Sequence, residues 1–168
     1  GLTDIVRLDL HQDLYIVHHT QWANQKAQSM GIEKDYEIAL QDMKKISNAC
    51  HADFFITGDF DFSDDIYEVN IKIYNPSNLK IIDSMTYKNE DCFSLADEVS
   101  LGIKQGIDIS QTYLDNVIDL PVTEIYTNSF DAFKNCSLWI KYWNEGNLVE
   151  AAKYLDKTIE IDETFAYA

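Results

Sequence analysis

Residues Asp53 to Tyr87, DFFITGDFDFSDDIYEVNIKIYNPSNLKIIDSMTY, carry the clearest structural signal in the chain. We interpret them as three consecutive strands joined by two tight turns. In the middle strand, apolar residues alternate strictly with Glu68, Asn70 and Lys72, which gives one apolar face and one solvated face. The apolar residues are Tyr67, Val69, Ile71 and Ile73.

Residues typical of turns flank this middle strand, at 63–65 (Ser-Asp-Asp) and at 75–78 (Asn-Pro-Ser-Asn). The outer strands are less regular. Phe54, Phe55 and Ile56 are three apolar residues in a row, as expected of a strand covered on both faces. A sheet with one apolar face needs helices to cover it. The pattern therefore predicts an α/β (α+β) fold, with a mixed sheet whose three-strand antiparallel meander is covered by helices.

The chain before the meander supplies further elements. Leu2–Leu10 has the apolar spacing of a short helix, and the apolar run Leu14–His19 predicts a buried strand. Residues 20–34 show no clear period, and we expect a loop there. Asp35–Cys50 has a strong helical period. Together with the strand at Phe54–Thr57, these segments predict a βαβ unit with parallel strands and a right-handed crossover.

After the meander, the sequence predicts a helix that begins at 89–91, with Asp91 as its N-cap. Residues 110–127 carry Pro121 and no sustained period, and we interpret them as a linker. Two closely spaced helices follow, Ser129–Asn144 and Leu148–Ile161, and they predict an αα-hairpin. We therefore divide the chain into a domain at 1–109, a linker at 110–127 and a helical unit at 128–168.

The hairpin resembles a tetratricopeptide repeat. Seven residues fall at the spacing of the repeat signature: Asn135, Leu138, Trp139, Tyr142, Ala151, Leu155 and Glu163. Leu138, Tyr142 and Ala151 match the signature outright. Trp139 departs from it most, because it places a bulky side chain where the repeat has glycine. A single repeat cannot stack on itself, so the resemblance implies a longer array.

Residues 1–109 resemble the TolB-type amino-terminal α/β domain found before tetratricopeptide repeats in bacterial signalling proteins. The resemblance rests on the order of GLTDIV, LYIVHH, the helix to Cys50, DFFITGDF with Gly58, the meander and DCFSLADEVS. Domains of this family begin with a strand upstream of the GLT helix, which this chain lacks.

Composition excludes several classes of partner. The chain has 29 acidic and 13 basic residues, a net charge of −16, and this field repels nucleic acid and anionic lipid. No run of 18 apolar residues is present, which argues against membrane insertion. Arg7 is the only arginine, so the forked cations that clamp anionic substrates are missing.

No motif of a catalytic or cofactor site is present: G-x-S-x-G, GxxxxGK[ST], GxGxxG, HExxH and C-x-x-C are all absent. An acidic cluster could bind calcium, but it lacks the glycine and the glutamate of such a loop, and we interpret it as a solvated turn that protects a sheet edge. Its members are Asp59, Asp61, Asp64 and Asp65. We expect the histidines to be packed or on the surface: His11, His18, His19 and His51. We expect the cysteines to be apolar fillers, with one disulfide as the alternative: Cys50, Cys92 and Cys136. We predict no catalytic residue, cofactor or metal.

Four aromatic residues crowd the first helix of the hairpin and are the candidates for partner binding: Phe133, Trp139, Tyr142 and Trp143. They form either a packed core or a groove for a protein partner. The two resemblances imply a soluble, non-catalytic sensing or protein-interaction region of a larger bacterial signalling or regulatory protein. The alternative is an accessory component of cell-envelope assembly or transport, like TolB. A third reading, an enzyme, requires a pocket that joins His18 or His51 to acids at the strand ends. The sequence leaves open whether the chain is cytoplasmic or periplasmic and whether it forms a homo-oligomer.

Overall fold

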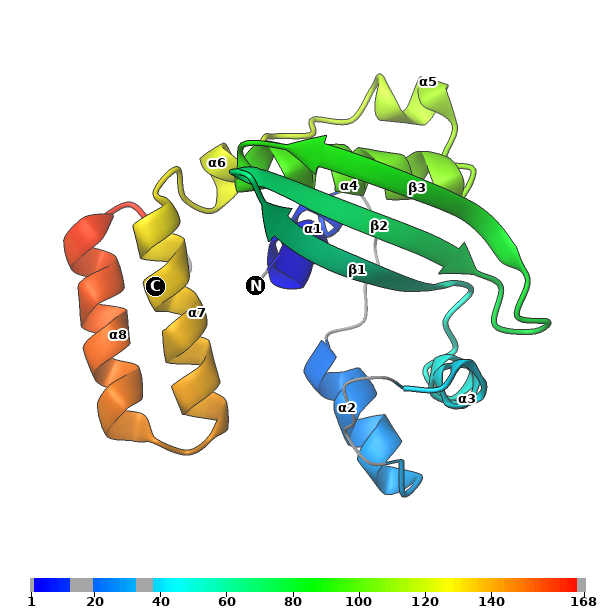
Figure 1. The fold of residues 1–168 in the computed structure, drawn as a ribbon, viewed down its shortest axis with the longest axis horizontal. Helices are drawn as coiled ribbons and strands as arrows, with labels where there is room; N and C mark the ends of the chain where they lie inside the picture. Colours follow the sequence, from blue (N-terminus) through cyan, green and yellow to red (C-terminus); the bar gives the residue numbers. More distant parts are fainter. Residues whose placement is uncertain (1, 13–19, 33–37, 166–168) are drawn as a thin grey trace.

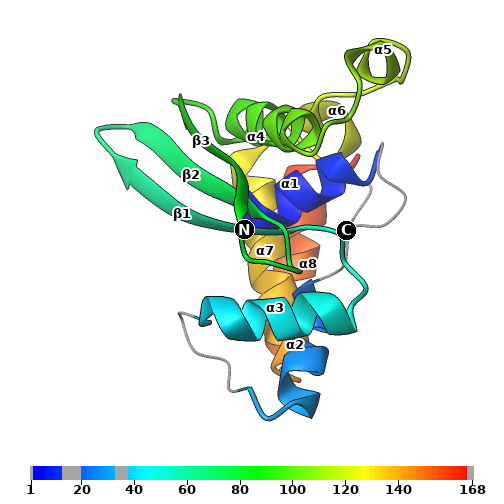
Figure 2. The same cartoon turned by 90° about the vertical axis from the view of Figure 1, so that its right-hand side faces the viewer.

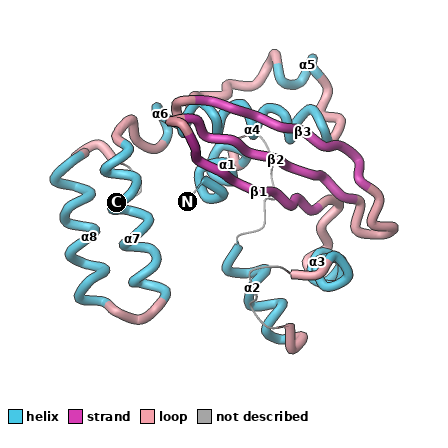
Figure 3. The backbone as a smooth tube through the Cα atoms, viewed as in Figure 1, coloured by secondary structure: helices cyan, strands magenta, loops and turns pink. Residues whose placement is uncertain are grey.

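The computed structural model of the chain describes residues 2–12, 20–32 and 38–165, and it confirms the predicted fold class (Figure 1). The elements in order are α1 (Leu2–Leu10), α2 (Thr20–Ser29), α3 (Leu40–Ala49), β1 (Phe55–Ser63), β2 (Ile66–Tyr74), β3 (Ile81–Asn89), α4 (Cys92–Gly106), α5 (Gln111–Leu114), α6 (Val122–Ile125), α7 (Phe130–Asn144) and α8 (Leu148–Ile161). Figure 3 shows the three strands side by side, with the α7–α8 hairpin beyond one end of them.

The sheet is an antiparallel meander in the order β1-β2-β3. Val69 of β2 lies opposite Phe60 of β1 and Tyr87 of β3, so these side chains share the apolar face. The turn between β1 and β2 consists of Asp64 and Asp65, both with positive φ, at 53° and 61°. Positive φ at both central residues is the requirement of a two-residue type I′ hairpin turn.

Helix α4 covers the apolar face of β2 and β3, and α1 packs against α4; Figure 2 shows both helices on the same side of the sheet. Ile5 of α1 and Leu95 of α4 are fully buried between these layers. The predicted N-cap is confirmed, because the carboxylate of Asp91 accepts a hydrogen bond of 2.7 Å from the backbone N–H of Ser94. Gly102 allows α4 to approach β3, since a Cβ at this position would overlap the side chain of Tyr87.

The predicted loop at 20–34 is wrong for residues 20–29, which form helix α2. Its buried contact is made by a small residue, Ala27, which packs with Ile46 and Cys50 in a cluster separate from the main core. Alanine gives a weak hydrophobic period, which is why the sequence pattern did not reveal the helix. Helix α3 begins at Leu40 instead of Asp35, and residues 35–37 lie outside the described part.

The prediction that the first strand is covered on both faces is also wrong. Phe54, which directly precedes β1, and Ile56 in β1 are both exposed, at the edge of the described sheet. The predicted strand Leu14–His19 lies outside the described residues, and with it the predicted parallel pairing and βαβ unit.

Helices α7 and α8 form the predicted antiparallel hairpin, and their turn contains Gly146 with φ of +74°. The hairpin shares one continuous core with the sheet and its covering helices. Phe165, after α8, packs edge-on against Tyr126 with ring centroids 4.5 Å apart. Val122 is fully buried in the same core, so the segment predicted as a linker contributes packed side chains in its second half.

Candidate interaction surfaces

The structure places the four aromatic residues of α7 in different environments. Phe133 is buried, with its ring centroid 5.9 Å from that of Phe93 and 6.1 Å from that of Tyr126. Trp139 is partly buried and packs against the same core. Both side chains therefore anchor the hairpin to the rest of the molecule.

The other two aromatic residues lie toward the far end of the hairpin. Tyr142 is half-buried and stacks on Tyr154 of α8, with ring centroids 5.4 Å apart and planes 7° apart. This stack holds the two helices together and is flanked by the ammonium groups of Lys141 and Lys157. Trp143 is 60% exposed and is the one member of the four with a largely free side chain.

An exposed apolar surface lies at the α7–α8 turn, which we call the hairpin tip. It consists of Trp143, Leu148 and Val149, whose exposed fractions are 60%, 59% and 79%. Figure 1 shows this turn at the end of the hairpin remote from the sheet. Sequence reasoning missed Leu148 and Val149, although two adjacent apolar residues directly after the turn residue Asn147 were the available signal.

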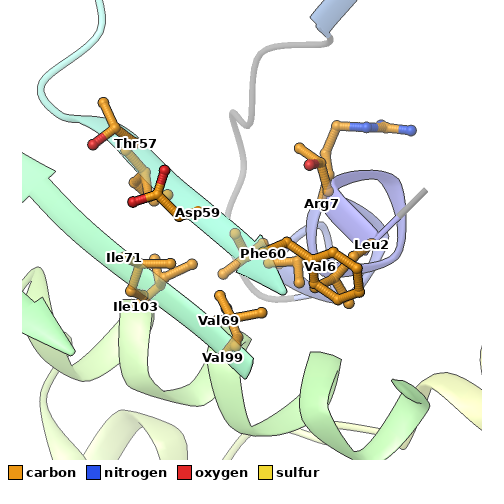
Figure 4. A pocket seen from close by; sticks show the side chains of 14 residues that line it. Leu2, Val6, Arg7, Thr57, Asp59, Phe60, Val69, Ile71, Val99 and Ile103 are labelled. Atoms are coloured by element: carbon orange, nitrogen blue, oxygen red, sulfur yellow. The ribbon is translucent and has the colours of Figure 1, made fainter. Parts of the chain in front are cut away.

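A cavity of about 310 Å³ lies between α1 and β1, with β2 and α4 as its floor (Figure 4). Val6 of α1, Phe60 of β1 and Val99 of α4 are among the apolar residues that line it. Arg7 also borders the cavity, but Figure 4 shows its guanidinium directed away from β1. The sequence signal for this cavity was the period of two in Ile56, Gly58, Phe60 and Phe62, and we did not identify it.

Ile56, Phe60 and Phe62 of β1 lie on the face of the sheet that α4 covers at β2 and β3, yet their side chains are exposed to solvent. Phe60 and Phe62 both pack against Tyr67, with ring centroids 5.9 Å and 4.4 Å away, and are 52% and 50% exposed. Asp59 and Asp61 point to the opposite face by the alternation of the strand. No strand of the described part pairs with the outer edge of β1.

A buried ionic cluster forms a further group of polar side chains. The ammonium group of Lys104 lies 2.8 Å from Oδ2 of Asp119 and 3.8 Å from Oδ2 of Asp9. The amide of Gln12 donates to Oδ1 of Asp9 and to the carbonyl oxygen of Leu120, each at 2.8 Å. Each charged group of the cluster has a partner within the protein. Because these partners come from different elements, the cluster connects α1 and α4 to the segment before α6.

Burial raises the pKa of the Asp9 carboxyl, and the neighbouring Lys104 ammonium only partly offsets this effect. Burial also raises the pKa of Asp97, whose carboxylate accepts a hydrogen bond of 2.9 Å from the backbone N–H of Val122. The two carboxyls border a shallow hollow of about 250 Å³. Its lining is mostly acidic and includes Glu98 and Asp119, so it offers no cation to bind an anionic substrate.

The remaining candidates for chemistry are dispersed. The three cysteines are buried and free, as predicted, and burial raises the pKa of each thiol, which disfavours the nucleophilic thiolate. Nowhere in the described ranges do three or more His, Cys, Asp or Glu side chains gather in a way that could hold a metal ion. No described helix has the length and hydropathy of a transmembrane segment. His18 lies outside the described residues, and neither of the two cavities is lined by His51.

Comparison with known proteins gives little further information. No family model matches the chain, and no curated protein matches it. Among solved structures, the chain is similar to the LpoB C-terminal domain from Salmonella enterica, with 12% identity and a TM-score of 0.40. The likeness covers 44% of this chain and 56% of that one, so little more than half of that structure is spanned. At this identity and TM-score the likeness carries no argument about fold or function, and the TolB-type and tetratricopeptide resemblances stay predictions.

Proposed function

We propose that this chain is a non-catalytic protein-interaction region that binds its partner through the hairpin tip. The observation that carries the proposal is the exposure of Trp143, Leu148 and Val149 on adjoining ends of two packed helices. Large apolar side chains gathered on an otherwise polar surface are typical of protein interfaces, and tryptophan is enriched among the residues that dominate binding energy.

The hairpin presents this surface on a rigid support. Its base is fixed by the buried side chains of Phe133 and Cys136, and the part nearer the tip by the stack of Tyr142 on Tyr154. A surface held in place before binding loses little conformational entropy when the partner arrives, which favours affinity. The exposed acid Glu145 borders the tip, whereas Glu150 is partly buried and already paired with Lys153 at 3.1 Å, so a partner with a basic residue beside an apolar centre fits the tip best.

The larger role that we propose is that of an interaction arm in a bacterial signalling or regulatory protein. The TolB-type and tetratricopeptide resemblances of the sequence support this role. The alternative is an accessory component of cell-envelope assembly or transport. Both roles use the same kind of binding surface, and the identity of the partner distinguishes them.

The proposal is tested by site-specific photo-crosslinking with the full chain as bait. The photoreactive residue replaces Val149 in one protein and Ile118 in another, because Ile118 is 82% exposed but belongs to the segment between α5 and α6. We expect a partner to be captured from position 149 and not from position 118. The purified partner should then bind Val149→Asp at least about tenfold more weakly than Ile118→Asp, a difference of about 1.4 kcal/mol.

Equal capture from both positions, or equal affinity of both variants for the purified partner, would contradict the proposal. A captured response regulator, kinase or cyclase supports the signalling role. A captured envelope assembly or transport protein supports the alternative.

A further inference from the structure

The outer edge of β1 combines three features that occur together nowhere else in the described structure. The backbone edge of this nine-residue strand pairs with no described strand. On one face, Ile56 and Phe60 are 40% and 52% exposed beside the apolar cavity. On the other face, the strand carries acidic side chains. An unpaired strand edge presents N–H and C=O groups that bind another extended chain.

The cavity beside the edge suits apolar side chains better than a polar small molecule. Its volume of about 310 Å³ is lined along α1 by Leu2, Val6 and Leu10. Figure 4 shows Phe60 reaching toward Val6 and Leu2, while the guanidinium of Arg7 extends away from the strand. A small-molecule site normally contains several polar groups that converge on the ligand and fix its orientation. The polar residues that border this cavity, Thr3, Arg7, Thr57 and Asp59, are a minority in a mostly apolar lining.

The acidic face of β1 lacks cations. Neither Asp59 nor Asp61 forms an ion pair with any residue of the described part. Asp61 lies directly opposite Glu68 of β2, and the carboxylate of Glu68 is already paired with the ammonium group of Lys88 at 2.7 Å. Asp61 accepts a hydrogen bond of 3.2 Å from the hydroxyl group of Ser63, but neither aspartate has a cation partner in the described part. Both can therefore meet basic side chains on a strand that approaches from the open side, where opposite charges on neighbouring strands stabilise pairing.

We propose that the free edge of β1 binds an extended segment of a partner protein in which apolar and basic residues alternate. The segment adds a fourth strand to the sheet, its apolar side chains enter the cavity between α1 and β1, and its Lys or Arg side chains lie beside Asp59 and Asp61. This mode of recognition obtains affinity from main-chain hydrogen bonds and specificity from alternate side chains. The surface is separate from the hairpin tip, so the inference does not depend on the proposed function.

The competing occupant is a segment of this chain, Leu14–His19, which is apolar and follows α1 in the sequence. Its residues LYIVHH include no lysine or arginine to place beside Asp59 and Asp61. Charge complementarity therefore favours a basic partner segment, and the experiment separates the two.

The test uses the full chain and a fluorescent nine-residue peptide, KVKIKVKIK, whose binding is followed by anisotropy. A peptide of the same composition without alternation, KKKKKVIVI, controls for simple attraction to an acidic protein. We expect the alternating peptide to bind at least about tenfold more tightly than the control. Backbone amides of β1 should gain protection from hydrogen exchange on binding, because they acquire new hydrogen-bond partners.

Two matched charge-reversal variants complete the test. D59K/D61K places cations on β1, and D156K/E160K makes the same charge change on exposed positions of α8. We expect only D59K/D61K to lower the affinity for the alternating peptide, by about tenfold or more. The same variant should bind the acidic peptide EVEIEVEIE instead, because its charges are reversed. Circular dichroism confirms that both variants fold.

Three results would overturn the proposal. The two peptides of equal composition could bind equally, or both charge-reversal variants could weaken binding equally, and either result would show non-specific attraction. Binding of the alternating peptide that appears only in an Ile16→Asp variant would show that Leu14–His19 already occupies the edge.

Discussion

The ammonium group of Lys104 is completely buried and lies 2.8 Å from Oδ2 of Asp119. Lys104 belongs to α4, whereas Asp119 belongs to the segment between α5 and α6. The same ammonium group is 3.8 Å from Oδ2 of Asp9 in α1. One buried cation thus connects three segments of the chain, and this arrangement gives the first two predictions.

Replacing Lys104 by methionine should lower the free energy of unfolding by about 3 kcal/mol. The substitution keeps the apolar stem but leaves Asp9 buried without its cation, and breaking a buried ion pair from one side costs about 3–5 kcal/mol. We place the value at the low end because the side chain of Asp119 is partly exposed and can be solvated. Urea denaturation followed by circular dichroism measures the difference.

The matched control is Lys88→Met, which removes the exposed ion pair with Glu68. An exposed pair contributes about 0–1 kcal/mol, so this variant should differ little from the wild type. Equal losses in the two variants would show that the buried cluster has no special role in stability.

Stability should increase as the pH falls from neutral toward the ordinary Asp pKa of about 3.9. Burial raises the pKa of Asp9 and of Asp97 in the folded state, so the folded protein binds protons that the unfolded chain does not. Their ionisation opposes folding at neutral pH, and protonation removes this cost. Thermal unfolding between about pH 7 and pH 4 tests the direction of the change.

Asp162 behaves in the opposite way, because hydrogen bonds from Thr127 and Thr164 lower its pKa. Its contribution to the free energy of unfolding is lost only when the pH falls below the ordinary range of an aspartate.

The Asp9→Asn variant should show a flatter dependence of stability on pH than the wild type. Asparagine can still accept the hydrogen bond from Gln12, but it does not titrate. An unchanged profile would refute the assignment to Asp9.

Replacing Gly102 by alanine should destabilise the protein by about 1–3 kcal/mol, as overpacking of a core does. Alanine in a helix is ordinarily more favourable than glycine by about 0.5–1 kcal/mol. Here the added methyl group would overlap the ring of Tyr87 and approach Sδ of Met85. A Tyr87→Leu substitution in the same protein should recover part of the loss, and a double-mutant cycle of unfolding free energies measures this coupling. Independent effects of the two substitutions would contradict the predicted contact.

The aromatic residues of α7 should divide into two groups. Phe133→Ala should cost about 3–5 kcal/mol because it opens a cavity in the core, and Trp139→Ala should cost a few kcal/mol. In the facing helix α8, Leu155 is partly buried, and Leu155→Ala should also cost a few kcal/mol. Trp143→Ala should stay within about 0.5 kcal/mol of the wild type, since its side chain is largely exposed. Chemical denaturation of the four variants measures these differences, and a large loss in Trp143→Ala would show that this residue is structural.

The sequence by itself determined the elements whose signals are local. The alternation in β2, the cap of Asp91 on α4 and the turn between α7 and α8 each depend on residues only a few positions apart. The hydrophobic period of Thr20–Ser29 was too weak to reveal α2, because the residue that this helix buries, Ala27, is a small alanine. Local sequence patterns predict which face of a helix or strand is apolar, but they do not predict whether another segment covers that face.

Only the tertiary structure decided which apolar residues are covered. Phe133 and Trp143 lie on the same helix, yet one is buried against Phe93 and the other is exposed. Phe60 of β1 and Val69 of β2 share one face of the sheet, but only Val69 is covered by the helices. Burial depends on contacts between segments far apart in the chain, and the three-dimensional path of the chain sets those contacts.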